Sequence, residues 1–286
     1  PNFIEHICSY SFDNCRQIKE IHISSDSKLK TIDKYAFSFS IIKRIIIPSS
    51  VISIGERAFY FCKQLDEIII LSDSKLETIE KDAFSGSTIK SITIPSELIE
   101  LKEEWCSDTS YLNKIIVSPT NPRYCFFDEK MIIGKTNIEQ DNYDCLIFCV
   151  RNIKYIQIPN FIEHICSYSF DHCKQLVEIH IPDNSNLKII GKHAFSSSII
   201  KRIIIPSSVT SIGEGAFSLC NQLEEIIIPN DSKLETIEKD TFSYSKIKRI
   251  KIPSSVTSIG ENSFSYCKQL EEIIIPNDSK LQTIEK

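Results

Sequence analysis

The chain has 286 residues, of which 42% are hydrophobic and 25% charged, within the range of ordinary globular proteins. Its formal net charge of −5 argues against the basic stripe that nucleic-acid binding requires. No apolar run approaches the ~18 residues of a membrane span. We therefore expect no nucleic-acid partner and no membrane insertion within this chain. It starts at Pro1 and stops at Lys286 inside a repeat, so we expect both ends to be truncated and draw nothing from missing targeting signals.

Two alternating coils make up most of the chain. An A coil, Pro206–Ile228, reads PxxVxxIGxxAFxxCxxLxxIII, and a B coil, Pro229–Ile252, reads PNDSxLxxIxxxxFxxSxIxxIxI. The alternation runs through 1–117 and resumes from 159 to the end of the chain, where the last coil is cut off. Adjacent repeats of this length predict a solenoid, in which every coil packs only on its neighbours.

Each coil is expected to contribute one strand. In the A coil the apolar residues Leu223, Ile226 and Ile228 face one side, so Glu225 and Ile227 point outward by strand alternation. Such strands can pair only with those of adjacent coils, which predicts a parallel sheet. An aromatic residue marks the interior in every coil: Phe12, Phe37, Phe59, Phe84, Trp105, Phe170, Phe195, Phe217, Phe242 and Phe264.

The segment 118–158 breaks the pattern. Ile153–Ile158 still fits LxxIxI, so we expect a strand of the main sheet there. Upstream, the apolar runs Phe126–Ile133 and Cys145–Val150 flank the polar loop Gly134–Asp144. We interpret this as a hairpin-like insertion within one enlarged coil. Two interpretations stay open, namely a packed structural interruption and a dedicated binding loop.

The repeat IPSSVTSIGEGAFSLCNQLEEIIIP resembles the BspA-like, or Treponema-type, leucine-rich repeats, whose consensus is near LxxIxIPxxVxxIGxxAFxxC. The resemblance covers nearly the whole chain. The insertion PRYCFFDEKMII…CLIFC also resembles the enlarged irregular repeat of that family. The B coils depart from the consensus because they usually lack IG, AF or Cys. In the Cys place they carry Ser40, Ser87, Ser198 and Ser245.

The resemblance implies a single right-handed α/β leucine-rich-repeat solenoid over 1–286, mostly β, with regular coils at 1–117 and 159–286. A parallel sheet would line the concave face, and short strands or 3-10 turns the convex side. It also implies a cell-surface or secreted protein of mucosal bacteria or protozoan parasites, which adheres to a host cell-surface or extracellular-matrix protein. A cytoplasmic location is the alternative.

The outward positions of successive strands form two columns on the predicted sheet, and these columns make up the predicted binding surface. One alternates acid and base with coil type, and the other is rich in isoleucine. Neighbouring opposite charges stabilise a sheet, whereas exposed isoleucine flanked by charge favours partner binding; the two interpretations are compatible. The predicted partner-binding residues are Glu67, Ile69, Ser91, Thr93, Lys114, Ile116, Tyr155, Gln157, Arg202, Ile204, Glu225 and Ile227.

The chain has 11 cysteines, and those that follow the interior aromatic occur only in A coils. Adjacent A coils lie two strand spacings apart, roughly 9.6 Å, beyond the ~7 Å limit for a disulfide. We expect these thiols to be reduced and buried: Cys15, Cys62, Cys173, Cys220 and Cys267. In an oxidising compartment Cys125 could pair with Cys145 or Cys149. These three residues do not fit a zinc site, since they form no CxxC and have no nearby histidine.

No catalytic, cofactor-binding or metal-binding residue is predicted, because every His, Ser and Cys combination is explained by the repeat. Asn230 and Asn277 match the N-glycosylation pattern, although the same Asn-Asp-Ser also suits a turn. We therefore predict a non-enzymatic protein-binding repeat module, active in cell-surface adhesion. The alternatives are an intracellular protein-interaction scaffold and a structural spacer that presents other domains.

Overall fold

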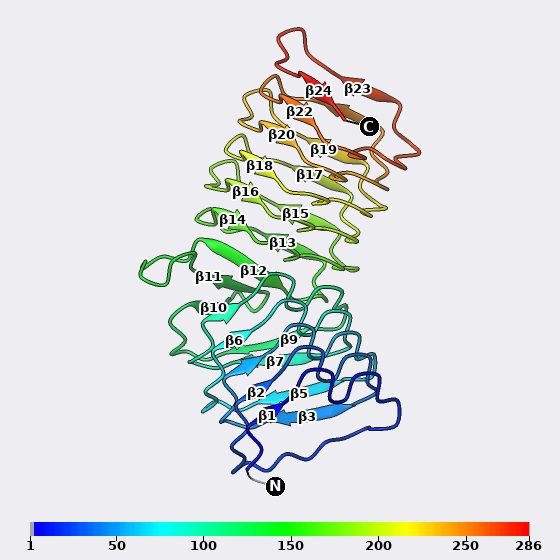
Figure 1. The fold of residues 1–286 in the computed structure, drawn as a ribbon. Coiled ribbons are helices and arrows are strands. Elements are labelled where there is room, and N and C mark those ends of the chain that lie inside the picture. Colours follow the sequence, from blue (N-terminus) through cyan, green and yellow to red (C-terminus); the bar gives the residue numbers. More distant parts are fainter. Residues whose placement is uncertain (1–2, 286) are drawn as a thin grey trace. The chain divides into compact units, whose positions relative to one another are not determined.

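The computed structural model describes residues 3–285, which form strands and turns and contain no helix. Two kinds of strand alternate along the chain (Figure 1). The longer ones are β3 (Arg44–Ile47), β5 (Glu67–Ile70), β7 (Ser91–Ile94), β9 (Lys114–Val117), β13 (Tyr155–Gln157), β15 (Glu178–His180), β17 (Arg202–Ile204), β19 (Glu225–Ile227), β21 (Arg249–Lys251) and β23 (Glu272–Ile274). The shorter ones are β1 (His6–Ile7), β2 (Thr31–Ile32), β4 (Ser53–Ile54), β6 (Thr78–Ile79), β8 (Glu100–Leu101), β14 (His164–Ile165), β16 (Ile189–Ile190), β18 (Ser211–Ile212), β20 (Thr236–Ile237), β22 (Ser258–Ile259) and β24 (Thr283–Ile284).

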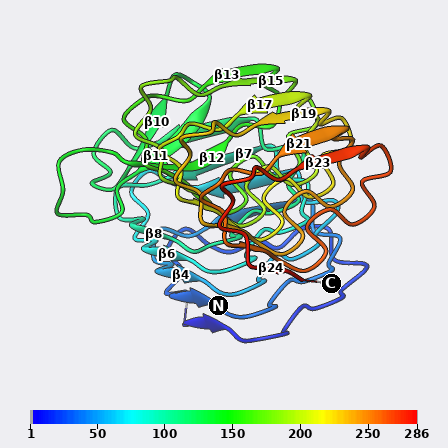
Figure 2. The same ribbon diagram turned by 90° about the horizontal axis from the view of Figure 1, so that it is seen from above.

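The chain divides into two compact units, Pro1–Ile132 (unit 1) and Ile133–Lys286 (unit 2). In unit 1 the short strands form a sheet in the order β1-β2-β4-β6-β8, and in unit 2 they continue in the order β14-β16-β18-β20-β22-β24. Figure 2 shows the long strands of unit 2 following one another along one edge of its coils. Each unit is therefore a stack of β coils with parallel strands, the predicted solenoid architecture.

The long strands are parallel, as expected from the sequence, and their ladders are divided into pairs. They pair two by two as β3-β5 and β7-β9 in unit 1, and as β13-β15, β17-β19 and β21-β23 in unit 2. Each regular pair joins a B coil to the A coil that follows it. From an A coil to the next B coil the backbone bonds vary: Lys43 N donates to Lys19 O at 2.8 Å, whereas Lys90 N lies 3.3 Å from Asp66 O and Lys201 N lies 3.4 Å from Val177 O. The short strands, not the long ones, form the continuous parallel ladders.

Stacked aromatic rings form the interior of both units. In unit 1, Phe37 and Phe59 stack with their ring centroids 5.1 Å apart, and Trp105 meets Phe84 edge to face at 6.5 Å. In unit 2, Phe195 stacks on Phe217 at 5.2 Å with parallel rings. These contacts confirm that one aromatic residue per coil occupies the same interior place. In the phenylalanine stacks the spacing is close to the rise between adjacent strands, so each of these rings covers the face of the next.

The enlarged coil contains β10 (Tyr124–Phe127), β11 (Met131–Gly134) and β12 (Cys145–Cys149). β11 and β12 are sheet neighbours joined by the loop Gly134–Asp144. The apolar run Phe126–Ile133, expected as one element, is instead divided by a turn at 128–130, where Asp128 and Glu129 have positive φ. The strand expected within Ile153–Ile158 is present as β13 and pairs with β15.

Candidate binding surface

Ion pairs line the outward face of the long strands. In unit 1, Arg44 Nε lies 2.8 Å from Glu67 Oε2. In unit 2 the equivalent pairs are Arg202 with Glu225 at 2.6 Å and Arg249 with Glu272 at 2.8 Å. Each of these arginines binds the glutamate of the following coil. The outward charges are therefore paired within the strand pairs.

An isoleucine stripe runs beside these ion pairs in each unit. Ile46, Ile116 and Ile204 keep 41%, 50% and 43% of their surface exposed. Ile69 and Ile227 lie in register with Ile46 and Ile204 and are half-buried. The intervening residues of the same strands point inward. This alternation leaves an isoleucine facing away from the core in six of the ten long strands of residues 3–285, whereas Thr93, Gln157, His180 and Lys251 occupy the same place in the other four.

The charge alternation fails at two strand pairs. In unit 1, Ser91 is in register with Lys114 and Thr93 with Ile116. In unit 2, Tyr155 is in register with Glu178 and Gln157 with His180. Among residues 3–285 neither Lys114 nor Glu178 has an ion-pair partner. The outward face of each unit therefore has one strand pair in which the repeated Arg-Glu ion pair is absent.

All twelve residues predicted to bind a partner lie on the outward face of long strands, exposed or half-buried. Unit 1 holds one half of them: Glu67, Ile69, Ser91, Thr93, Lys114 and Ile116. Unit 2 holds the other half: Tyr155, Gln157, Arg202, Ile204, Glu225 and Ile227. Their common placement is a geometric finding. Their role in binding stays a prediction.

The A-coil cysteines pack against serines of the B coils. Cys62 Sγ donates to Phe37 O at 3.0 Å and lies 3.5 Å from Ser40 Oγ. Burial raises the pKa of the Cys62 thiol to about 11, and that of Cys220 to about 12. Cys62, Cys173 and Cys220 are buried as expected, whereas Cys15 and Cys267 are only half-buried. Serine at the intervening place accounts for the separation of the cysteines.

The cysteines of the enlarged coil are free thiols in the structure. Cys125 is half-buried, and Cys145 and Cys149 are buried. A hydrogen bond with the Cys166 thiol, together with burial, raises the pKa of Cys145 well above its ordinary value. This neighbour is not predictable from sequence spacing, because the contact depends on the parallel pairing of β12 with β14.

A fully buried arginine, missed in the sequence, lies in unit 2. Arg151 is 1% exposed, and its guanidinium carbon lies 4.1 Å from the ring centroid of Phe148. Nη1 donates to Ser169 O at 2.8 Å and lies 3.3 Å from Cys173 Sγ, while Nη2 donates to Tyr168 O at 3.4 Å. The guanidinium thus donates hydrogen bonds to backbone carbonyl oxygens of the next coil.

The bonds from Arg151 come in addition to backbone bonds. In the regular coils a turn carbonyl accepts a backbone N–H from the preceding coil, as Ala194 O does from Phe170 N at 2.7 Å. The enlarged coil keeps this bond, since Cys149 N donates to Ser169 O at 3.0 Å, and Tyr168 O accepts the N–H of Asp171 at 3.1 Å. Arg151 therefore adds charged donors to carbonyl oxygens that already have one backbone donor each.

The two possible glycosylation sites lie in exposed turns. Asn230 and Asn277 are exposed. In each, the serine of the Asn-Asp-Ser pattern has a structural task, since Ser232 Oγ accepts the N–H of Leu234 and Ser279 Oγ that of Leu281, both at 3.1 Å. Ser74, in a turn without the glycosylation pattern, makes the same bond to Leu76. Turn geometry therefore accounts for the serine at both sites.

No group of three His, Cys, Asp or Glu side chains within residues 3–285 is arranged to hold a metal ion. The same residues include no helix long and apolar enough to cross a membrane.

Solved structures similar to this chain are bacterial leucine-rich-repeat proteins. A leucine rich cell surface protein of Faecalibacterium prausnitzii is 25% identical, with a TM-score of 0.68; the match covers 100% of this chain and 77% of that one. The pneumococcal vaccine antigen PcpA is 21% identical, with a TM-score of 0.73 and coverage of 100% and 78%. A leucine-rich repeat protein of Eubacterium ventriosum is 20% identical, with a TM-score of 0.74 and coverage of 93% and 75%. The last two support the fold alone.

A comparison with curated protein sequences found no match. The family model described as "BspA type Leucine rich repeat region (6 copies)" matches residues 1–113 and 141–271. The matched residues take in the regular coils of both units. The chain therefore belongs to the BspA-type leucine-rich repeat family.

Proposed function

We propose that the chain is a non-enzymatic protein-binding module that acts at the cell surface, in adhesion to a host cell-surface or extracellular-matrix protein. The observation that carries this proposal is the outward isoleucine stripe beside internally paired charges. Isoleucine side chains that point away from a complete core do not add to that core. Exposed apolar strips of this kind are typical of contact sites.

The paired charges suit such a surface. Arg202 and Glu225 satisfy one another, so a partner that covers Ile204 would not leave either charge buried alone. Partner contact would then draw its affinity mainly from apolar burial. Lys114, Tyr155 and Glu178, where the repeated pairing fails, are the positions from which we expect specificity.

The proposed location draws support from similarity. The F. prausnitzii relative is described as a cell surface protein, and its match extends over the whole of this chain. The adhesion partner is an expectation from the family resemblance and has no such support. The test must therefore address binding directly.

The test replaces Ile69, Ile116, Ile204 and Ile227 with Asp in the full chain. We expect adhesion to cultured epithelial cells and to purified matrix protein to fall at least ~10-fold, because four apolar contacts would become charged. Circular dichroism and the thermal midpoint establish that the variant is folded. Replacement of the exposed Ile52, outside the long strands, with Asp is the location control. Unchanged adhesion by a folded variant would show that the isoleucine stripe is not the binding surface.

An intracellular scaffold is the second candidate, because 11 free cysteines are compatible with a reducing compartment. Thiol titration and glycan mass analysis of protein from its native source separate the two. Reduced cysteines and an unmodified Asn230 would favour the scaffold. A glycan on Asn230 or a disulfide would favour the cell surface.

A further inference from the structure

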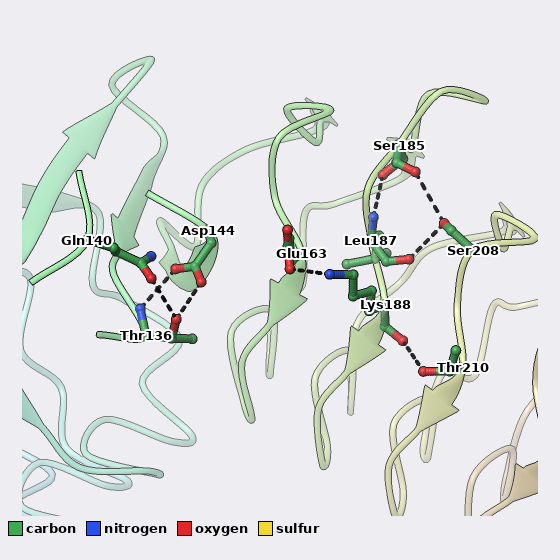
Figure 3. Close-up of polar contacts among 9 residues, drawn as sticks. All are labelled: Thr136, Gln140, Asp144, Glu163, Ser185, Leu187, Lys188, Ser208 and Thr210. Carbon is green, nitrogen blue, oxygen red and sulfur yellow. Dashed lines mark hydrogen bonds and ion pairs between the residues drawn. The ribbon is translucent and has the colours of Figure 1, made fainter. Parts of the chain in front are cut away.

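The inserted loop of unit 2, Gly134–Asp144, has a fixed form. Asp144 accepts hydrogen bonds from the backbone N–H of Thr136 at 2.9 Å and from the Thr136 hydroxyl (Figure 3). Gln140 Nε2 donates to Asn142 O at 2.8 Å. Burial alone would raise the pKa of Asp144, but the bonds from Thr136 and Gln140 outweigh it and hold the pKa below its usual range. The loop is therefore preorganised around an ionised carboxylate.

The loop is also anchored to the regular coils that follow it. Asp144 O accepts the backbone N–H groups of Glu163 and His164 at 2.8 and 3.0 Å. In the next coil Lys188 Nζ reaches back to Glu163 Oε2 at 2.6 Å, as Figure 3 shows. These contacts fix the loop relative to two successive coils.

A groove of about 500 Å³ opens between the loop and these coils. Its lining combines three carboxylates, two amides and two aromatic rings, and contains no lysine or arginine. The lining residues are Asp141, Asn142, Tyr143, Asp144, Phe161, Glu163 and Asn186. Its volume is in the range of ordinary ligand sites.

The carboxylates in this groove are not equivalent. Thr136 binds Asp144, and Lys188 neutralises Glu163. Asp141 is exposed and has no ion-pair partner among residues 3–285. Phe161, on the facing coil, keeps 38% of its surface exposed. Lys135 Nζ lies 5.7 Å from the centroid of the Tyr143 ring, so the ring of Phe161 is the aromatic surface left for a ligand. The groove therefore presents this ring together with Asp141 and Asp144, two carboxylates without an ion-pair partner among residues 3–285.

We infer that this groove binds an arginine side chain of a protein partner. A guanidinium is planar, stacks on aromatic rings and donates two parallel hydrogen bonds to a carboxylate. The Asn142 and Asn186 side chains add acceptors for its remaining N–H groups. A lysine ammonium matches the charge but can neither stack nor bind in the bidentate manner. This surface is separate from the isoleucine stripe and does not rest on the proposed adhesion function.

The first coil of unit 1 provides a matched control. Its Phe3 and Glu5 occupy the coil positions of Phe161 and Glu163, and Glu5 pairs with Lys30 at the same 2.6 Å. An aspartate equivalent to Asp141 does not lie beside them in the described residues. A substitution of Phe3 thus repeats the chemical change made at Phe161 outside the groove.

The experiment uses the full ¹⁵N-labelled chain and a capped pentapeptide, Gly-Ser-Arg-Ser-Gly, followed by NMR. We expect saturable shifts of the amides of 141–144 and 161–163, with a Kd of roughly 1–10 mM. The peptide with citrulline, which has nearly the same shape but no charge, should bind at least ~10-fold more weakly. The lysine peptide should fall between them.

Variants give the second part of the test. Asp141→Asn and Phe161→Ala should each weaken binding of the arginine peptide by at least ~3-fold, and Phe3→Ala should leave it unchanged. Absence of saturable shifts, equal binding of the citrulline peptide, or full binding by folded Asp141→Asn would each overturn the inference. The variants Ile204→Asp and Ile227→Asp should retain peptide binding, so failure of the adhesion proposal is distinguishable from failure of this one.

Discussion

At the scale of single residues, a buried arginine is the largest departure of unit 2 from an apolar interior. Arg151 adds side-chain donors to Ser169 O and Tyr168 O, which also accept the backbone N–H groups of Cys149 and Asp171. Its burial is tolerable because the guanidinium is hydrogen-bonded and lies over the Phe148 ring. Sequence patterns do not reveal such a residue, since an isolated arginine next to a turn suggests a solvated side chain.

Replacement of Arg151 by Met should therefore be destabilising. We expect the free energy of unfolding to fall by about 1–3 kcal/mol, because two carbonyl oxygens lose a hydrogen bond to a charged donor while keeping their backbone donors. Urea denaturation followed by circular dichroism measures the change. Lys154→Met, at an exposed position three residues further on, is the control and should change stability by less than ~0.5 kcal/mol. Similar midpoints for the two variants would contradict the assigned role.

The buried thiols predict a pH dependence of stability. An ordinary cysteine has a pKa of 9.0, whereas burial raises that of Cys62 to about 11 and that of Cys220 to about 12. Between these values the folded chain holds more protons than the unfolded chain. The free energy of unfolding should therefore be unaffected by the thiols below pH 9 and fall as pH rises from 9 towards 11–12.

Urea midpoints at pH ~8 and ~10.5 measure this effect. The double variant Cys62→Ser/Cys220→Ser is the comparison, since the B coils already carry serine at this place. We expect a smaller loss of stability with pH in the variant than in the parent chain. The same loss in both would show that other groups govern the alkaline transition.

At the scale of elements, the two faces of a long strand have different tasks. In β17, Ile203 is 1% exposed and packs inward, while Arg202 and Ile204 point outward. The register alternates because side chains of a strand project to opposite sides. Core packing holds the strand in place, and the outward positions are left to vary. This separation of tasks makes the outward face suitable for binding.

Substitutions within β17 test this separation. Ile203→Ala should lower the free energy of unfolding by about 2–5 kcal/mol through the cavity it leaves. Arg202→Ala should lower it by about 1 kcal/mol or less, since its ion pair with Glu225 is half-exposed to solvent. Chemical denaturation of both variants provides the comparison. A cost for Arg202→Ala as large as that for Ile203→Ala would mean that the outward ladder is a main source of stability.

At the scale of the molecule, each unit is stabilised by contacts between adjacent coils. The aromatic stacks and the short-strand ladders both propagate from one coil to the next, as a repeat architecture requires. No bound ion is needed to account for the packing of residues 3–285. Coil stacking alone supplies the interior of each unit.

A chelator should accordingly leave the fold unchanged. Since no His, Cys, Asp and Glu side chains in 3–285 group as metal ligands, excess EDTA should shift the thermal midpoint by less than ~1 °C. Differential scanning calorimetry before and after dialysis measures this. A large decrease that zinc or calcium reverses would reveal a structural metal.

The sequence by itself determined the coil register and the outward columns. An aromatic residue, such as Phe217, recurs at the same place in the regular coils. Strand alternation then determines which side of the sheet Arg202 and Ile204 face. Local periodicity suffices for these, because each coil repeats the same short-range pattern. The family resemblance came from the same pattern and was confirmed.

The tertiary structure decided what depends on contacts between coils. Only it shows that the long strands pair two by two, that Arg151 is buried and that Cys145 meets Cys166. The groove beside Asp141 likewise joins a loop to residues of two later coils. Periodicity identifies which residues repeat, but the inserted loop has no repeat to copy. Its conformation is set by hydrogen bonds such as those between Asp144 and Thr136, which no spacing in the sequence encodes.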